Sequence, residues 1–502
     1  MKRNFLPGGW RGQAGAVLLI AVAVGMVLRF FRLGARELSI DESLSWAESS
    51  GHTVADVLSM QHRLDSGKFP IYELAQYGWM RAFGESEAAM RALPALIGTL
   101  SIVLVFILGV ELMLAVRGDA EPSPASLREA ASPVKERARY EDESVYMVAA
   151  LCALLFAVGL PSVEIARQAR MYSMMQAWIL AQVIFLLRAR RLPGLANYAG
   201  LAVLSALAVA TNFTAVLVMA AEAIWLIYLY LYESRNGEIR SRAPWLMGAA
   251  LIAAMVLLLP FYPGLRYGVE GVKRGDYNWI KPPGRWEPFA TFEGGLGSWP
   301  FPLFVLFAIV GGVRLWRSNR DEAVLLILWI GLPAIVLFAG SYLVTPMLVT
   351  RYLISSFVPV FILTAIGIES LSSRNYRAAA IVAIVSLCLL RVSSDLRAGD
   401  TRWRDACEIA LTKAGPQRRL GTYNEYYLIS YYIPAAERDS VQVIRLPFRG
   451  AESEAPPVAI VSPTVAPAQF AEIRRQYPVV VGKFRNVTVV SRPEAGVQVP
   501  AS

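Results

Sequence analysis

Two acidic residues, Asp41 and Glu42, follow the first apolar segment of the chain and lie at the start of a long polar stretch. A carboxylate beside a membrane could act as a general base that takes the proton of an acceptor hydroxyl. The pair is equally compatible with a short helix on the membrane surface, with Asp41 as the N-cap of a helix beginning near Glu42 and Trp46 at the interface. Both interpretations are therefore retained.

A second polar element is the stretch Asp65-Ser66-Gly67-Lys68-Phe69-Pro70-Ile71-Tyr72. Pro70 disfavours helix at Phe69 and suits the first turn of a helix that starts just after it. Lys68 would then precede a helix N-terminus, whose positive dipole end attracts phosphate. The alternative is a lysine that extends its ammonium group to the lipid headgroups.

Three arginines, Arg167, Arg170 and Arg351, lie at the ends of apolar segments. These ends are expected on the extracytoplasmic side of the membrane, where positive charge is less common than on the cytoplasmic side. Arg167 and Arg170 are three residues apart, and Arg351 is followed by Tyr352. Guanidinium groups bind phosphate oxygens well, so a lipid phosphate would account for their placement. Interfacial snorkelling, or pairing with Glu164, is the simpler alternative.

The elements that must position these residues are membrane helices. Of the 502 residues, 55% are hydrophobic and 18% are charged, which is too apolar for an ordinary soluble enzyme. We expect an all-α polytopic membrane protein with about eleven spans, because the apolar segments are long enough to cross a bilayer. The predicted spans are 14–31, 91–115, 144–160, 172–188, 196–212, 214–231, 245–262, 300–316, 322–341, 352–370 and 377–391.

Arginine and lysine gather in alternate connections between these spans, which marks those connections as cytoplasmic. Loop 32–90 and all residues after about 392 are then extracytoplasmic, and the protein is expected in the plasma or inner membrane. The same bias accounts for the net charge of +10, so we predict no nucleic-acid partner.

The composition becomes soluble near the C-terminus. We expect a transmembrane catalytic domain over 1–392 and a small extracytoplasmic α/β domain over 393–502. The latter has β-like runs at 441–446, 458–461, 479–481 and 487–490, and helical patterns near 403–411 and 468–477.

The three cysteines and two histidines form neither a disulfide framework nor a zinc motif. His52 and His62 are interpreted as ordinary loop residues, and no metal-binding residue is assigned. No cofactor is predicted, and a divalent metal ion is left open.

The order of the motifs resembles that of the GT-C membrane glycosyltransferases, in particular the protein O-mannosyltransferase and aminoarabinose transferase-like group (glycosyltransferase family 39/83 type). The shared elements are the acidic pair, Lys-x-Pro-Ile-Tyr at 68–72, Arg-Ala-Leu-Pro-Ala-Leu at 91–96, Ala-Arg-Met-Tyr at 169–172 and Arg-Tyr-Leu at 351–353. The resemblance covers about residues 10–370.

The resemblance implies a transferase that takes a sugar from a polyprenyl-phosphate carrier at the extracytoplasmic face, for a lipid, glycan or protein acceptor. It implies Asp41 as the general base with Glu42 beside it, and Lys68, Arg170 and Arg351 at the carrier phosphate. The further substrate contacts that we assign are Asp65, Tyr72, Tyr172 and Tyr352. The chain departs from the aminoarabinose transferases at Gly67, where they carry a carboxylate.

Two other functions are compatible with the sequence: a non-enzymatic polyprenyl-lipid transporter or flippase, and an inactive scaffold subunit. A transporter would be expected to show repeat symmetry and ionisable residues near mid-bilayer. No internal repeat is visible, and Glu111 and Glu222 are the notable charges within the spans. The unusual charges gather at one membrane face, which favours interfacial chemistry.

Overall fold

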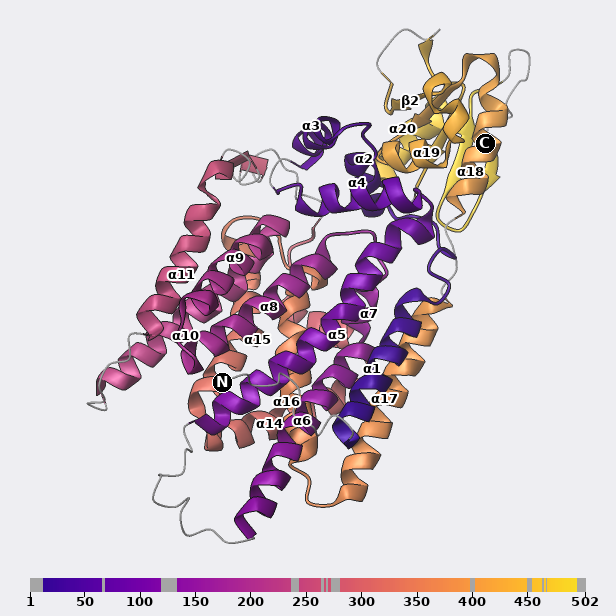
Figure 1. The fold of residues 1–502 in the computed structure, drawn as a ribbon. Helices are drawn as coiled ribbons and strands as arrows, with labels where there is room; N and C mark the ends of the chain where they lie inside the picture. Colours follow the sequence, from indigo (N-terminus) through magenta and orange to yellow (C-terminus); the bar gives the residue numbers. More distant parts are fainter. Residues whose placement is uncertain are drawn as a thin grey trace. The chain divides into compact units, whose positions relative to one another are not determined.

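The computed structural model describes residues 12–65, 68–118, 133–235, 243–262, 266–267, 270–271, 280–397, 402–448, 454–462, 465 and 467–493. The chain forms two compact units. Unit 1 contains Met1–Phe31, Gln61–Ala75 and Arg91–Arg397, and unit 2 contains Arg32–Met60, Gln76–Met90 and Ala398–Ser502. Figure 1 labels the elements.

Unit 1 is a helical bundle (Figure 1). Its long helices are α1 Gln13–Phe30, α5 Glu87–Gly118, α6 Pro133–Val158, α8 Tyr172–Arg191, α9 Leu195–Thr211, α10 Val216–Arg235, α11 Ala243–Leu257, α14 Phe301–Ser318, α15 Arg320–Leu343, α16 Phe357–Glu369 and α17 Arg374–Leu396. Shorter elements are α7 Leu160–Ala166, α13 Glu287–Leu296 and the 3-10 turns η1 Phe213–Ala215, η2 Leu259–Phe261 and η3 Thr350–Ser356. Three helices contribute residues to both units: α3 Val54–Asp65, α4 Ile71–Phe83 and α5, whose residues 87–90 belong to unit 2.

The predicted apolar segments are helical, which confirms an α-helical integral membrane protein. In the described parts of the chain, eight helices are long and apolar enough to cross a membrane. A ninth span is formed if the bent pair Ser144–Val158 and Leu160–Ala166 counts as one. The remaining two segments, Leu195–Thr211 and Pro244–Leu257, form shorter apolar helices.

Helices of unit 1 approach one another closely at glycines, which have no side chain in the way. α14 packs on α16, and a Cβ built on Gly311 would lie 1.9 Å from the Leu363 carbonyl oxygen. A Cβ on Gly367 would lie 2.0 Å from the Phe307 carbonyl oxygen. Helix association in lipid depends on such close backbone packing, because there is little hydrophobic drive between helices.

The bend between α6 and α7, 58° at Gly159, leaves backbone carbonyls without helical partners inside the membrane region. The guanidinium of Arg29, on α1, donates to the Ala157 carbonyl at 3.0 Å, and the Ser162 hydroxyl donates to the Gly159 carbonyl at 2.8 Å. Arg29 is fully buried. A buried arginine in a membrane helix is therefore explained by the break in its neighbour.

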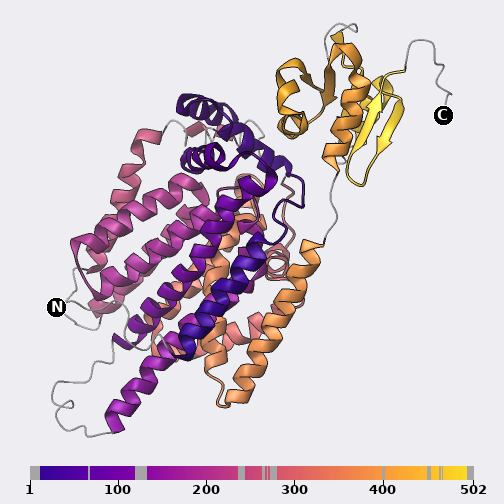
Figure 2. The ribbon, with the colours of Figure 1, turned by 45° about the vertical axis from the view of Figure 1, so that its right-hand side comes forward.

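Unit 2 contains helix α2 and a small α/β domain. Its elements include α2 Ile40–Ser49, α18 Trp403–Ala414, η4 Gly415–Gln417, β1 Arg419–Thr422, α19 Tyr426–Tyr432, η5 Ala435–Ser440, β2 Gln442–Arg445, β3 Val458–Val461, α20 Pro467–Gln476, β4 Val479–Lys483 and β5 Thr488–Ser491. The sheet order is β2-β1-β3-β5-β4, with β1 parallel to β2 and β3, and β5 antiparallel to β3 and β4. α18 packs against the sheet, as Figure 2 shows.

The predicted strands and both predicted C-terminal helices are present, which confirms the α/β character of this segment. Strand β1 and helix α19 were not predicted. β1 reads Arg-Leu-Gly-Thr and lacks the β-branched run that marks a strand. It is a central strand, because Leu420 and its neighbours pair with β2 on one side and β3 on the other.

Candidate active site

The acidic pair that the sequence singled out lies in the first turn of α2, in unit 2. Ser39, not Asp41, is the N-cap: its hydroxyl accepts from the Glu42 backbone N–H at 3.3 Å. The Glu42 carboxylate returns to the Ser39 backbone N–H at 2.9 Å and its hydroxyl at 3.1 Å, which completes a capping box. The expectation that Asp41 caps a helix beginning near Glu42 is therefore wrong, since the helix begins at Ile40.

The capping box separates the two carboxylates by role. Glu42 is buried and holds the start of the helix, whereas Asp41 is only partly buried. Ser45 and Glu48 follow Asp41 at helical spacings of four and three, so they share its face of α2, and both are buried. Glu48 is not among the residues predicted from the sequence, although its position two helical turns after Asp41 could have indicated it.

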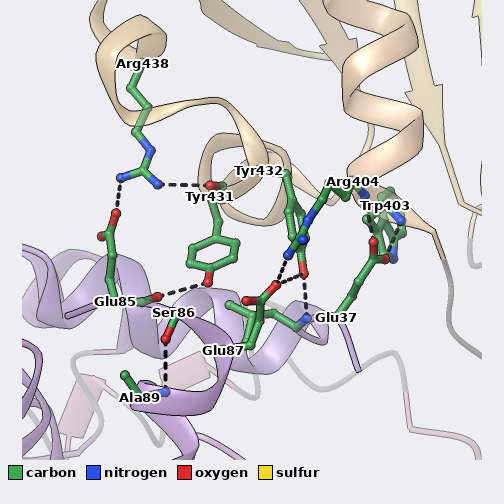
Figure 3. Close-up of polar contacts among 11 residues, drawn as sticks. Glu37, Glu85, Ser86, Glu87, Ala89, Trp403, Arg404, Tyr431, Tyr432 and Arg438 are labelled. Atoms are coloured by element: carbon green, nitrogen blue, oxygen red, sulfur yellow. Dashed lines mark hydrogen bonds and ion pairs between the residues drawn. The ribbon is translucent and has the colours of Figure 1, made fainter. Parts of the chain in front are cut away.

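The C-terminal segment fixes the start of α2 within unit 2 (Figure 3). The Tyr432 hydroxyl accepts from the Leu38 backbone N–H at 2.8 Å, directly before the Ser39 cap. Glu37, one residue earlier, accepts from the backbone N–H of Arg404 at 2.9 Å and from that of Trp403 at the start of α18. Burial raises the pKa of the Tyr432 hydroxyl, so this group stays protonated.

The other end of α2 is fixed in the same way. The Trp46 indole N–H donates to the Glu85 carboxylate at 2.9 Å, and the ring of Tyr431 packs edge-on against Trp46 with centroids 5.4 Å apart. Arg438 forms an ion pair with Glu85 at 2.8 Å (Figure 3). Its guanidinium also lies 4.9 Å from the Trp46 ring centroid. The helix that carries Asp41 is thus held at both ends by residues 403–438.

In unit 1, Lys68 lies three residues before Ile71, where α4 begins, as the sequence predicted. Its ammonium group is nearly buried and forms ion pairs with Glu73 at 2.8 Å and Asp65 at 3.2 Å. Glu73 is fully buried in the first turn of α4. Glu73 is not predicted from the sequence, because the aminoarabinose transferases carry their carboxylate at the position of Gly67, before the lysine.

Backbone contacts hold the Lys68 segment in place. Gln61 of α3 donates to the Lys68 carbonyl at 2.7 Å, and the Phe69 backbone N–H donates to the Ala210 carbonyl at the end of α9 at 3.2 Å. The Tyr72 ring is buried in the main hydrophobic cluster of unit 1. Lys68 is therefore positioned by α3, α4 and α9 together.

The two arginine motifs lie at adjacent element starts in unit 1. Arg170 is mostly buried and precedes Tyr172, the first residue of α8. Arg351 lies at the start of η3, with its guanidinium 5.9 Å from the Tyr352 ring centroid. α8 and η3 pack on each other, and Gln176 of α8 donates to the Ile354 carbonyl of η3 at 3.4 Å.

These starts also adjoin the segment that holds Lys68. The Thr214 hydroxyl of η1 lies 3.5 Å from the Met175 sulfur of α8, and η1 follows directly on α9, where Phe69 is bound. A chain of contacts therefore joins Lys68, Arg170 and Arg351 at one end of unit 1. Of the two aromatic residues beside the arginines, Tyr172 is buried in the main hydrophobic cluster, and Tyr352 packs on a smaller one.

Arg167 has a structural role that accounts for it. Its guanidinium donates to the carbonyls of Leu28, Arg29 and Phe31 at 2.9–3.0 Å, at the C-terminus of α1. These are the last carbonyls of a helix, which need partners from outside the helix. The interpretation of Arg167 as a lipid-phosphate ligand is not needed to explain it.

Among the described residues, no group of three or more histidine, cysteine, aspartate or glutamate side chains could hold a metal ion. All three cysteines are buried and unpaired by disulfides. His52 accepts through its carbonyl from Tyr77 and Arg81, both at 3.1 Å, which is an ordinary loop contact.

Comparison with known proteins gives the fold a counterpart. No protein-family model and no curated protein matches the sequence. The structure is similar to that of ArnT from Cupriavidus metallidurans bound to undecaprenyl phosphate, with a TM-score of 0.61 and 13% identity over 96% of this chain and 98% of that chain. The apo form of the same protein gives a TM-score of 0.60 at 14% identity, with the same coverage.

A more distant likeness is to the archaeal oligosaccharyltransferase AglB from Archaeoglobus fulgidus, in complex with an inhibitory peptide and a dolichol-phosphate. The TM-score is 0.53 at 11% identity, over 98% of this chain and 76% of that chain. The chain therefore has the GT-C fold, as its motif order predicted.

Proposed function

We propose that the protein is a glycosyltransferase that moves a sugar from a polyprenyl-phosphate carrier to an acceptor at the extracytoplasmic face of the membrane. The observation that carries the proposal is the fold, which is shared over 96% of the chain with a structure that holds undecaprenyl phosphate. The partly buried Asp41 on α2 and the arginines before α8 and in η3 supply the groups that such a reaction needs.

In the proposed reaction, the acceptor hydroxyl oxygen forms a bond to the anomeric carbon while the bond from that carbon to the carrier phosphate breaks. Asp41 takes the hydroxyl proton, and the bonding electron pair leaves with the phosphate. Arg170 and Arg351 stabilise the charge that develops on the phosphate oxygens. Direct displacement inverts the anomeric centre, since retention would need a second carboxylate about 5–5.5 Å from the first.

The remaining predicted residues take supporting roles in this proposal. Lys68 already neutralises the buried Glu73, so we assign it first to fixing the start of α4 and second to the phosphate. Tyr72 and Tyr172 pack in the core and position their basic neighbours. Asp65 and Tyr352 remain substrate contacts, because both are at least partly exposed.

The distribution of basic residues supports the orientation. Lys68, Arg170 and Arg351 lie at one end of the bundle, whereas Arg188, Arg190 and Arg191 lie at the far end of α8. With the far end as the cytoplasmic side, the first loop and residues after 392 are extracytoplasmic.

The test is transfer by purified protein offered a panel of polyprenyl-phosphate sugars, with products identified by mass spectrometry. We expect Asp41→Asn to lower kcat by about 10²–10⁴-fold while the protein stays folded and binds donor. Glu42→Gln is the matched control: glutamine can complete a capping box, so this variant should keep most activity. If the wild-type protein consumes none of the donors, the proposed glycosyltransferase activity is contradicted.

One observation favours transport as a second function. Glu222 of α10 is buried within the membrane region and accepts from Gln182 of α8 at 2.5 Å. An ionisable residue at such a position often serves ion or proton movement. A transporter would still move polyprenyl lipid across vesicle membranes in the Asp41→Asn variant, and this movement would stop in Glu222→Gln. Sugar transfer by a transferase would instead be lost in Asp41→Asn and kept in Glu222→Gln.

A further inference from the structure

Unit 2 contains a pocket that the catalytic groups do not use. Its volume is about 580 Å³, within the range of small-molecule sites. The walls come from three places in the sequence: the Glu85-Ser86 turn, one face of α18, and residues 431–438 (Figure 3). All of these belong to the same compact unit as α2.

The lining combines an apolar wall with charged groups. Leu411, Ile433 and Pro434 contribute aliphatic surface, and Tyr432 contributes a ring. Arg404, Glu408 and Leu411 follow at spacings of four and three, so they lie on one face of α18. The Glu408 side chain is exposed and can meet a ligand.

The charges in the lining balance. Glu85 and Glu408 are matched by Arg404 and Arg438, and the ion pair of Arg438 with Glu85 fixes one side of the pocket at 2.8 Å. On the other side Arg404 pairs with Glu87 at 2.5 Å and lies 5.7 Å from the Tyr432 ring centroid. A balanced lining gives no net attraction to a phosphate or a polyanion, and it supplies both hydrogen-bond donors and acceptors.

A neutral carbohydrate matches this lining. The hydroxyl groups of a sugar can donate to carboxylates and accept from guanidinium groups, and its C–H faces pack on tyrosine and aliphatic side chains. A lipid tail would remove water from the charged groups of the lining without offering them hydrogen bonds, which costs free energy. A peptide strand would need a sheet edge, and the described lining residues lie in helices, turns and loops.

The pocket is coupled to the helix that carries Asp41. Tyr432 lines the pocket, and its hydroxyl binds the backbone N–H of Leu38, three residues before Asp41. Glu85 lines the pocket and accepts from Trp46 at the other end of α2. A ligand in the pocket is therefore two contacts away from each end of α2.

We infer that this pocket binds a neutral oligosaccharide, the acceptor glycan or the glycan part of the acceptor. The role as acceptor rests on the proposed function, whereas the binding of carbohydrate does not. Bound there, the glycan is held by the unit that carries the candidate base.

The test uses the full-length protein in detergent micelles, applied to an array of neutral oligosaccharides with a peptide array beside it. We expect retention on oligosaccharides, and titration of the best one by calorimetry gives its affinity. Leu411→Trp fills the pocket and should weaken binding by about tenfold or more. Thr412→Trp, on the next, exposed position of α18, adds the same ring outside the pocket and should leave the affinity unchanged.

If Leu411→Trp does not fold, as judged by thermal unfolding, Glu408→Ala decides the matter, because an exposed residue can be truncated without loss of the core. It should also weaken binding, by removal of a charge-assisted hydrogen bond. Wild-type protein that retains no oligosaccharide, or a folded pocket variant with unchanged affinity, would overturn the inference. So would peptide binding that is sensitive to Leu411→Trp.

The two proposals fail separately. Binding to the array needs no sugar donor. If the protein binds glycan and consumes no donor, the proposed glycan pocket is supported and the proposed transferase activity is refuted. If the protein transfers sugar and the pocket variants bind glycan as tightly as wild type, the transferase activity is supported and the proposed glycan pocket is refuted.

Discussion

The two ends of α8 carry arginine for opposite reasons. At its C-terminal end, Arg188 and Arg191 pair with Glu111 of α5, and Arg190 pairs with Asp321 and Glu322 at the start of α15. Positive charge at a helix C-terminus is favoured by the dipole. At the other end, Arg170 precedes the N-terminus of α8, whose first turn contains no acidic residue, and there the dipole disfavours a cation.

The difference separates arginines with a structural role from those that we propose to bind the carrier phosphate. Those at the C-terminal end tie three helices together through carboxylates of their neighbours. Arg170 adds positive charge where the helix already supplies it, and Arg351 does the same at η3, which precedes α16. Two guanidinium groups therefore lie at one end of unit 1, where we propose that the carrier phosphate binds.

The largest effect on stability is expected from Arg190→Ala. Glu322 is fully buried and pairs with Arg190 at 2.5 Å, so the variant leaves a buried carboxylate without its cation. We expect the free energy of unfolding to fall by about 3–5 kcal/mol, measured by SDS titration in micelles. Arg317→Ala, at an exposed position of α14, should change it little. An unfolding midpoint equal to wild type would remove the structural half of the comparison.

Lys68→Met should destabilise the protein nearly as much, since Glu73 is fully buried beside it. We expect a loss of about 3–5 kcal/mol, and recovery of much of it when Glu73→Met is added, because paired removal leaves no uncompensated charge. A double-mutant cycle on unfolding free energies measures the coupling. Additive effects would show that the two side chains do not act as a pair.

Arg170→Ala should act on the reaction more than on the fold. We expect kcat/KM for the donor to fall by about a hundredfold, the usual cost of one group that stabilises transition-state charge. Arg170→Lys keeps the positive charge without the planar guanidinium, so its kcat/KM should lie between those of wild type and Arg170→Ala. Steady-state kinetics with a series of donor concentrations gives the values. Loss of stability with unchanged kinetics would make Arg170 a structural residue like Arg190.

The smallest effect is expected from Arg191→Ala. Glu111 keeps its second partner, Arg188, at 2.6 Å, so the carboxylate is not left alone. We expect a loss of about 1 kcal/mol or less in unfolding free energy and no change in donor kcat/KM. A kinetic defect in this variant would show that the C-terminal end of α8 also takes part in the reaction.

The sequence predicted the bundle well because hydrophobic length and charge bias are local signals. It predicted the start of α4 after Pro70 for the same reason, since proline acts on its own neighbours. Ser39 as the cap of α2 was readable too, because serine precedes Glu42 by three residues, but the acidic pair drew the assignment to Asp41. Glu73 could not be assigned, since nothing local shows that Lys68 turns toward it.

Sequence alone determined the class of protein, the set of apolar helices, the α/β character of the C-terminal segment and the motif order that resembles the GT-C fold. Those properties depend on composition and on residues close together in the chain. Only the tertiary structure showed that Arg29 binds the break between α6 and α7, that Arg167 binds the C-terminus of α1, and that Glu42 holds a cap while Asp41 does not. It alone showed that residues 403–438 hold both ends of α2. Each of these depends on which distant groups meet, and that is decided by packing.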